Sequence, residues 1–349
     1  MYLKAATLDD LLARVFDKLL KSKVRLKATK GDNVEISGVS LELTQPRARL
    51  SRTEVKGTIF SCLGEFLWYV SCSNTSSQIE YYISRYKDFA ETDGTIWGAY
   101  GPRIFGGERS QYEIVIDTLR KKPTSRQAVI QLFDRTDIEE EHKDIPCTCT
   151  LQFLQRDGAL HMIAHMRSND AYWGLPHDIF AFTMIQEIVA NELGYRLGSY
   201  KHLVGSLHLY DASRDEVGRF LSEGVQPTSA MPPMSPGRQW PDINEVFAAE
   251  ALLRRQGISA VDTAIATAAR LTPFWADMVR LLAIYALTKG SHGEPERLRP
   301  VVKLQNEMSS SYFRTYIRRR SRVIERKQEE LNLSIAESPE HEESALAAS

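Results

Sequence analysis

The chain has 349 residues, of which 43% are hydrophobic and 26% are charged, and its formal net charge at pH 7 is −1. This composition excludes a disordered protein and predicts a globular one with a large core, while the near-zero charge excludes attraction of the whole molecule to nucleic acid or to an anionic membrane. No apolar run reaches membrane-spanning length and the N-terminus lacks a signal peptide's apolar core, so we expect a cytoplasmic protein.

The first part of the chain predicts a helix, a strand and a second, buried helix. Residues 7–20 begin with the capping residue Thr7 and place their apolar side chains on one helical stripe. Residues 34–44 alternate in the manner of a strand, and residues 57–70 are mostly apolar. The second helix carries one carboxylate, Glu65. Because an unpaired buried carboxylate is costly, Glu65 is a candidate functional residue.

A β-hairpin is predicted in the centre of the chain. Residues 128–134 form a short apolar strand, and residues 147–170 form two alternating strands joined by a turn at residues 156–158. We expect Cys147 on the first strand of this hairpin and Arg167 at the end of the second. The hairpin would thus bring a thiol and a guanidinium together.

A helix and a further strand follow the Gly-Leu-Pro turn. The apolar spacing predicts a helix over residues 178–193, packed on the sheet, with Asp178 in its first turn. Residues 200–212 then alternate as a strand that places His208 and Tyr210 on the same face. These polar side chains are candidate ligand contacts.

The end of the sequence differs in character from the rest. We predict a core over residues 1–215, a Pro, Ser and Met-rich connector over 216–240, a helical region over 241–325 and a charged, disordered tail over 326–349. The basic cluster Arg318–Arg320 is interpreted as a solvated helix face.

The four cysteines show no CxxC pair and no histidine at zinc spacing, so neither a disulfide framework nor a metal site is predicted. Each is either a small buried hydrophobe or a reactive thiol. Cys147 is the candidate nucleophile, because arginines are expected beside it and positive charge favours the thiolate.

Six segments together resemble the thymidylate synthase family, in the family's order, between about residues 57 and 210. They resemble its Glu-Leu-Leu-Trp segment, its Tyr-Gly pair, its phosphate-binding Ser-Arg-Arg, its Pro-Cys nucleophile strand, its Arg-Ser-x-Asp and Gly-Leu-Pro segment, and its Gly-Asp-x-His-x-Tyr strand. In this chain they read "GEFLWYV", "GAYG", "PTSRQ", "DIPCTCTLQF", "MRSNDAYWGLPHDIFAF" and "GSLHLY". The resemblance implies an α/β (α+β) fold, a three-layer core with a large mixed sheet followed by a C-terminal helical extension. It also implies a homodimer formed across the sheet face.

The resemblance implies catalytic roles for three of these residues. Cys147 would attack C6 of a pyrimidine nucleotide and so make C5 a nucleophile that captures the one-carbon unit of 5,10-methylenetetrahydrofolate. Glu65 and Tyr100 would organise water and proton transfer around the base. The implied reaction needs no metal.

The remaining roles implied by the resemblance concern binding. Arg167 and Ser168 would hold the 5′-phosphate, which Arg126 would reach from the other subunit. The sugar hydroxyl would be bound by His208 and Tyr210. The folate would be bound by Asp170 and Trp97.

Asp178 stands where thymidylate synthases, by this resemblance, have an asparagine. An asparagine amide donates to uracil O4 and accepts from N3–H, whereas a carboxylate accepts from the amino group of cytosine and favours a protonated N3. This pattern resembles the family's cytidylate hydroxymethylase branch. We therefore predict 5-hydroxymethylation of CMP or dCMP by hydration of a C5 methylene. Two alternatives stay open: reductive methylation of dUMP, and a catalytically inactive nucleotide-binding assembly protein.

Overall fold

The computed structural model describes residues 1–28, 31–290 and 295–322, and the predicted tail over 326–349 lies outside them. Contacts between residues divide the chain into two compact units, Met1–Pro241 and Asp242–Ser349. The first unit contains a β-sheet with its covering helices. The described part of the second unit is helical.

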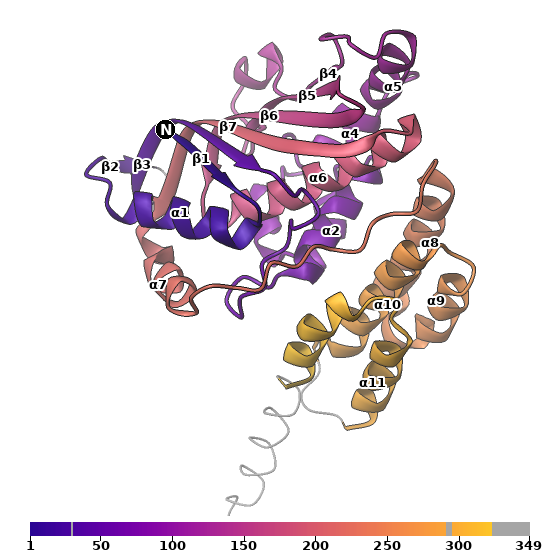
Figure 1. The fold of residues 1–349 in the computed structure, drawn as a ribbon. Helices are drawn as coiled ribbons and strands as arrows, with labels where there is room; N and C mark the ends of the chain where they lie inside the picture. Colours follow the sequence, from indigo (N-terminus) through magenta and orange to yellow (C-terminus); the bar gives the residue numbers. More distant parts are fainter. Residues whose placement is uncertain (29–30, 291–294, 323–349) are drawn as a thin grey trace, which may run out of the picture. The chain divides into compact units, whose positions relative to one another are not determined.

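The sheet of the first unit is mixed, as the resemblance implies (Figure 1). In the described part of the chain it has seven strands in the order β1-β3-β7-β6-β5-β4, with β2 paired to β3. Strands β6 and β7 are parallel neighbours, while β5 is antiparallel to both β4 and β6. The strands are β1 (Tyr2–Ala5), β2 (Arg25–Ala28), β3 (Gly31–Leu43), β4 (Val129–Gln131), β5 (Thr148–Arg156), β6 (Ala159–Asp170) and β7 (Arg196–Tyr210).

The predicted hairpin is formed by β5 and β6. Asp157 and Gly158 have φ angles of 50° and 72°, the left-handed values that a two-residue hairpin turn requires. The expectation that Cys147 lies on the first strand is wrong by one residue. Strand β5 begins at Thr148, where the pairing with β6 is irregular, although the Cys147 carbonyl still accepts from the Arg167 backbone N–H at 2.8 Å.

Helix α6 (Gly174–Leu193) lies along one face of the sheet, and its contacts are with β6 and β7 (Figure 1). Helix α2 (Ile59–Val70) packs against α6, which gives the three predicted layers. The prediction that α6 begins at Asp178 is wrong, because the helix starts four residues earlier and Asp178 is not in its first turn. Pro176 falls within the first turn instead, where its missing N–H has no helical partner to lose.

The opening helix α1 (Leu8–Leu20) is capped as predicted, because Thr7 accepts from the Asp10 backbone N–H at 3.1 Å. The remaining α-helices that begin and end in the first unit are α3 (Ser76–Glu80), α4 (Tyr100–Phe105), α5 (Gln111–Lys121) and α7 (Arg214–Ser222), and its 3-10 helices are η1 (Ser84–Phe89), η2 (Arg135–Ile138) and η3 (Asp211–Ser213). Helix α7 occupies residues where the sequence predicts the end of the core and the start of the connector.

The connector after α7 is anchored on α6. Glu187, buried on that helix, forms an ion pair with the fully buried Arg49 and accepts from the Met234 backbone N–H at 3.1 Å. Two distant segments therefore share one buried carboxylate. Removal of either charge would leave the other unpaired in the core, which is strongly destabilising.

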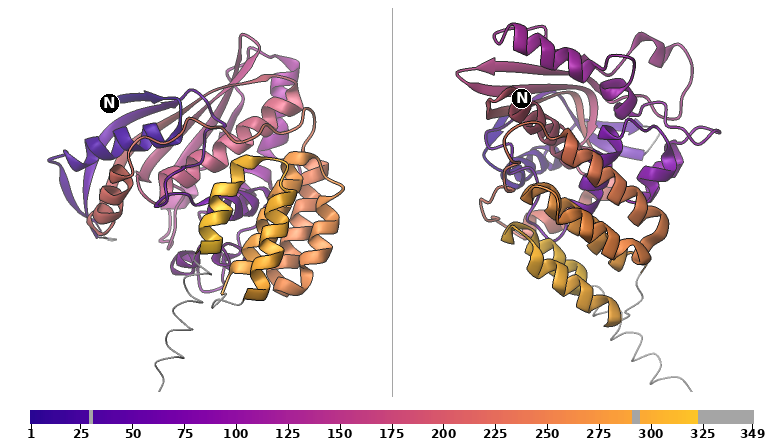
Figure 2. Two further views of the ribbon diagram at one scale, coloured as in Figure 1. Left: turned by 60° about the horizontal axis from the view of Figure 1, so that its bottom comes forward. Right: turned by 90° about the vertical axis from the view of Figure 1, so that its right-hand side faces the viewer.

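The second unit contains α9 (Val261–Ala268), α10 (Pro273–Thr288) and α11 (Leu298–Glu307), and α8 (Trp240–Gln256) leads into it. Helix α10 contacts both α9 and α11 (Figure 2). In the predicted basic cluster, Arg318 is exposed, but Arg320 donates to Thr288 Oγ1 at 3.0 Å and lies over the Tyr285 ring. Within the described ranges, no helix is long and apolar enough to cross a membrane.

Candidate active site

A cavity of about 480 Å³ opens in the first unit where β6 and β7 end and α6 begins. Its size is typical of a small-molecule site. The walls come from α2, η1, the segment before β5 and the ends of β6, β7 and α6. Nine of the eleven site residues predicted from the sequence line it, and these are Glu65, Tyr100, Cys147, Arg167, Ser168, Asp170, Asp178, His208 and Tyr210.

The hairpin places Cys147 beside Arg167. The Arg167 Nη2 lies 3.8 Å from the Cys147 Sγ, and the same guanidinium donates to the carbonyls of Pro146 and Ile145, each at 2.9 Å. These backbone bonds hold the guanidinium against the segment that carries the thiol. A positive charge in this position favours the thiolate, the nucleophilic form of cysteine. Arg167 is exposed as well, so it can also contact an anionic group of a ligand.

Glu65 is buried among tyrosines. One carboxyl oxygen, Oε1, accepts from the Tyr69 hydroxyl at 3.1 Å and from the Tyr86 hydroxyl. The other oxygen, Oε2, is buried without a hydrogen-bond partner among the residues that the structure describes. Burial raises the pKa of the Glu65 carboxyl, and the two tyrosine hydrogen bonds oppose that shift. A cavity-lining carboxyl of this kind can hold a water molecule and exchange a proton with it.

Hydrogen bonds fix the Tyr100 hydroxyl next to the backbone segment that carries the Cys147 thiol. Its hydroxyl oxygen accepts from the Thr148 backbone N–H at 3.2 Å and lies 2.9 Å from Thr148 Oγ1. Thr148 directly follows Cys147, so these contacts determine where the Tyr100 hydroxyl stands relative to the nucleophile. Burial, followed by the charges of Asp178 and Cys147, raises the pKa of Tyr100, which keeps the hydroxyl protonated.

Asp178 is 7% exposed and lines the cavity from the first part of α6. Its Oδ2 accepts from the Asn169 Nδ2 at 2.7 Å. Burial first, and then the charge of Glu65, raises the pKa of Asp178 well above its ordinary range, while the hydrogen bond from Asn169 opposes this shift. Two buried carboxyls therefore stand near each other in one cavity, a feature common at functional sites.

The ends of β6 and β7 supply the other polar walls. His208 and Tyr210 lie edge to face with ring centroids 5.0 Å apart, as neighbours on one face of β7. The Asp170 Oδ1 accepts from the backbone N–H groups of Tyr172 and Trp173 at 2.8 and 3.1 Å. This turn fixes the Asp170 carboxylate at the edge of the cavity, where its charge can be matched by donors of a ligand.

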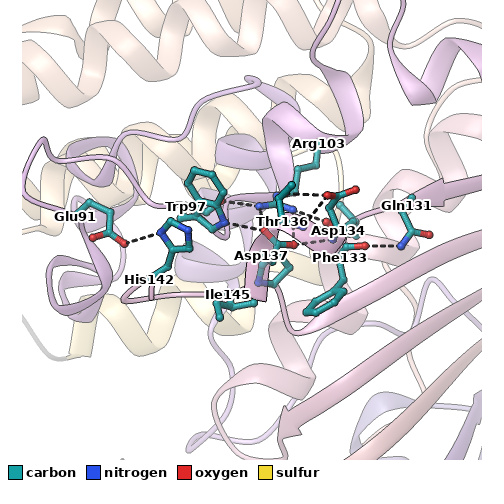
Figure 3. Close-up of polar contacts among 12 residues, drawn as sticks. Glu91, Trp97, Arg103, Gln131, Phe133, Asp134, Thr136, Asp137, His142 and Ile145 are labelled. Carbon is teal, nitrogen blue, oxygen red and sulfur yellow. Dashed lines mark hydrogen bonds and ion pairs between the residues drawn. The ribbon is translucent and has the colours of Figure 1, made fainter. Parts of the chain in front are cut away.

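Trp97 does not line this cavity. Its ring stacks on His142 with centroids 3.9 Å apart and planes at 6°, and its Nε1 donates to Asp137 at 2.7 Å (Figure 3). Asp137 is itself buried in an ion pair with Arg103 (Figure 3). The structure therefore engages both the face and the N–H of this indole within the protein. A role of Trp97 in folate binding stays a prediction.

Arg126 also lies apart from the cavity that contains Cys147. It is exposed and lines a second hollow of about 430 Å³ together with Lys122, Gln127 and Arg156. Within one protomer the structure does not bring Arg126 to the thiol. Its predicted action from a second subunit remains a prediction.

Sequence reasoning gave no role to several cavity-lining residues, among them Tyr86, Asn169 and His177. Asn169 and His177 lie inside the quoted motif and directly precede Asp170 and Asp178, so their position in that motif was the available signal. Tyr86 lies in η1, outside every motif, and carried no signal.

His177 is held in one tautomer by its neighbours. Nδ1 must donate to the Trp173 carbonyl at 2.9 Å, so Nε2 is left to accept from the Ser61 hydroxyl at 3.0 Å. Burial, followed by the charge of Lys56, lowers the pKa of His177 to about 4. The imidazole is therefore neutral at ordinary pH.

Comparison with known proteins is consistent with this geometry. A family model described as thymidylate synthase matches residues 10–247. A protein of Delftia phage PhiW-14 named deoxyuridylate hydroxymethyltransferase is 30% identical over 206 residues, which is 55% of this chain and 57% of the relative. The chain thus spans just over half the length of that curated relative.

Solved structures show the same fold. The crystal structure of thymidylate synthase from T4 phage has a TM-score of 0.51 at 20% identity, covering 62% of this chain and 82% of that one. The structure of thermostable thymidylate synthase A from Bacillus subtilis has a TM-score of 0.53 at 19% identity, covering 64% of this chain and 86% of that one.

Proposed function

The chain belongs to the thymidylate synthase family, and on that premise we propose that it is a folate-dependent one-carbon transferase that hydroxymethylates C5 of cytosine in CMP or dCMP. The observation that carries this proposal is the carboxyl of Asp178 in the same cavity as the Cys147 thiol. An ionised carboxyl accepts from the cytosine amino group and from a protonated N3, whereas uracil presents an oxygen at C4 that the carboxylate repels.

The proposed reaction assigns a task to each group around the thiol. Cys147 adds as the thiolate to C6, which moves electron density to C5 and makes that carbon a nucleophile. C5 bonds to the methylene carbon of 5,10-methylenetetrahydrofolate, which is at the oxidation level of formaldehyde. Loss of the C5 proton then expels tetrahydrofolate and leaves an exocyclic methylene on C5. Glu65 and Tyr100 move the proton that C5 loses and place the water that adds to the exocyclic methylene. Departure of Cys147 from C6 then restores the ring.

The cavity walls fit a nucleotide together with a flat cosubstrate. Arg167 and Ser168 supply a cation and a hydroxyl for a phosphate, and His208 and Tyr210 supply polar groups for a sugar. Trp68 and Trp173 line the same cavity and offer apolar surfaces on which a pterin ring can stack. Asp170, fixed at the cavity edge, would accept from donors of the pterin.

The proposed assembly is a homodimer in which Arg126 of each protomer reaches the phosphate at the other protomer's site. Its place in a second basic hollow, outside the cavity, supports this arrangement. Within one protomer the cavity has Arg167 and Arg85 as its guanidinium groups in the part of the chain that the structure describes. A second subunit would add positive charge where the phosphate binds.

A second candidate is hydroxymethylation of a uracil nucleotide. The name of the Delftia phage relative favours it, as does the raised pKa of Asp178, because a protonated carboxyl can donate to uracil O4 and accept from N3–H. Reductive methylation of dUMP and nucleotide binding without turnover are the further alternatives. All four differ in substrate or product.

One experiment separates these candidates. The full chain is incubated with 5,10-methylenetetrahydrofolate and with CMP, dCMP, UMP or dUMP, each tritiated at C5. The proposal predicts tritium release from a cytosine nucleotide and a product heavier than the methyl analogue by one oxygen atom. Release from uracil nucleotides alone favours the second candidate, and formation of dihydrofolate indicates reductive methylation. Nucleotide binding without any tritium release indicates the inactive binder.

A further inference from the structure

A chain of buried polar side chains leads from Asp178 into the protein, and of its members beyond Asp178 only Asn169 also lines the cavity. The Asn169 Nδ2 lies 2.7 Å from Asp178 Oδ2, and the Asn169 Oδ1 lies 3.1 Å from His202 Nε2. The His202 Nδ1 lies 2.7 Å from the Tyr200 hydroxyl. Three of these residues are 3% exposed or less, and they come from β6 and β7.

The chemistry of each group fixes the direction of every bond in this chain. If Asn169 donates its amide hydrogen to Asp178, its Oδ1 must accept, so His202 carries its proton on Nε2. The His202 Nδ1 is then an acceptor for the Tyr200 hydroxyl. All donors therefore point toward Asp178. Burial lowers the pKa of His202 to about 3, so the imidazole stays neutral and the chain keeps this polarity over the usable pH range.

We propose that the chain Tyr200–His202–Asn169 is a positioning device that keeps Asp178 a hydrogen-bond acceptor and thereby sets its preference for an amino-bearing base over an oxo-bearing one. This inference rests on the proposed function, because it concerns the base that Asp178 contacts. Loss of the Asn169 donor would favour the neutral acid, whose hydroxyl can then face the base. A neutral acid pairs with uracil as well as with cytosine, so base selection depends on the donor that Asn169 presents to Asp178.

The hydrogen bond from Asn169 also offsets part of the cost of burying the Asp178 charge. Burial and the neighbouring Glu65 both favour the neutral acid, whereas a charge-assisted bond from Asn169 favours the carboxylate. Successive hydrogen bonds in a buried network polarise one another, so the far hydroxyl of Tyr200 strengthens the bond that Asn169 makes. Substitutions of Asn169 or Tyr200 should therefore alter base selection through their effect on Asp178.

Two variants test this inference. Asn169→Leu has a similar volume but cannot donate to Asp178, and Tyr200→Phe removes only the last hydroxyl of the chain. The matched control is Thr183→Val, which removes a fully buried hydroxyl of α6 whose bonds go to backbone carbonyls of the same helix. The measurement is the calorimetric affinity of each protein for CMP, dCMP, UMP and dUMP, without folate and without turnover.

The expected result is a loss of base preference, and not a general loss of binding. The ratio of cytosine to uracil affinity should fall by about tenfold or more in Asn169→Leu, fall less in Tyr200→Phe and stay unchanged in Thr183→Val. A purely structural role would weaken all four nucleotides equally. Folded variants that keep the wild-type ratio would overturn the inference, as would a wild-type protein without any preference for cytosine.

Failure of the inference can be told apart from failure of the proposed function. If the wild-type protein prefers cytosine nucleotides but releases no tritium from C5, the proposed reaction is refuted. The ratios of cytosine to uracil affinity in the variants still decide the role of the hydrogen-bonded chain. If the wild-type protein turns over CMP or dCMP and Asn169→Leu keeps the wild-type ratio of cytosine to uracil affinity, only the proposed role of the hydrogen-bonded chain is refuted.

Discussion

Replacement of Asp178 by asparagine should exchange the base that the protein prefers. Asn169 presents a donor to Oδ2 of Asp178 at 2.7 Å, so it will hold the oxygen of an asparagine at that position. The new amide nitrogen is thereby turned toward the base. It can donate to uracil O4 but meets the cytosine amino group donor to donor. The structure therefore predicts the orientation of the new side chain as well as the change in preference.

The size of the effect follows from the burial of this position. Asp178 is 7% exposed, so a mispaired group beside it cannot be satisfied by bulk water. An unsatisfied buried donor costs about 1–3 kcal/mol. Affinity for a cytosine nucleotide should thus fall by about 5- to 150-fold. Affinity for the matching uracil nucleotide should rise, because its C4 oxygen gains a donor.

The assay is kcat/KM for C5 tritium release from the four nucleotides, with wild-type and Asp178→Asn proteins side by side. Melting temperatures show that the variant is folded. A variant that keeps the wild-type cytosine-to-uracil ratio would refute the reasoning, because the side chain at position 178 could then not be in contact with the base. An equal decrease in kcat/KM for all four nucleotides would indicate that Asp178 has a structural role instead.

Three further predictions concern the thiol, the second subunit and pH. Cys147→Ser should abolish C5 tritium release while nucleotide affinity stays within about twofold; residual exchange at the wild-type rate would exclude Cys147 as the nucleophile. Arg126→Ala should weaken phosphate binding and lose activity, yet an equimolar mixture of Arg126→Ala and Cys147→Ser should regain activity, because a mixed dimer contains one intact site; a mixture as inactive as its components would exclude the shared site. Asp178→Asn should raise the melting temperature relative to wild type at neutral pH. The raised pKa of Asp178 means that the fold favours the protonated acid, so wild-type stability is full below the ordinary value of 3.8 and declines as pH rises through the folded pKa. The increase in melting temperature should disappear below pH 3.8. An increase that is independent of pH would contradict a raised pKa of Asp178 in the folded protein.

The sequence by itself determined the local parts of the candidate site. Alternation and the Arg156-Asp157-Gly158 turn predict the hairpin that places Arg167 beside Cys147. The motif that contains Ser168, Asp170 and Asp178 is continuous in the chain, so its order survives folding. Hydrophobic period and turn chemistry act over a few residues, which is why the sequence can reveal them without knowledge of the fold.

Only the tertiary structure decided which side chains become partners. Tyr86 meets Glu65 because η1 packs beside α2, and His202 reaches Asn169 from a neighbouring strand. The same packing turns Trp97 toward His142 and Asp137, contacts that no sequence pattern indicated. Partners of this kind are far apart in the sequence and meet only when a whole core closes around them. A buried polar group must then find its hydrogen bonds wherever the packing allows, and no local pattern encodes that choice.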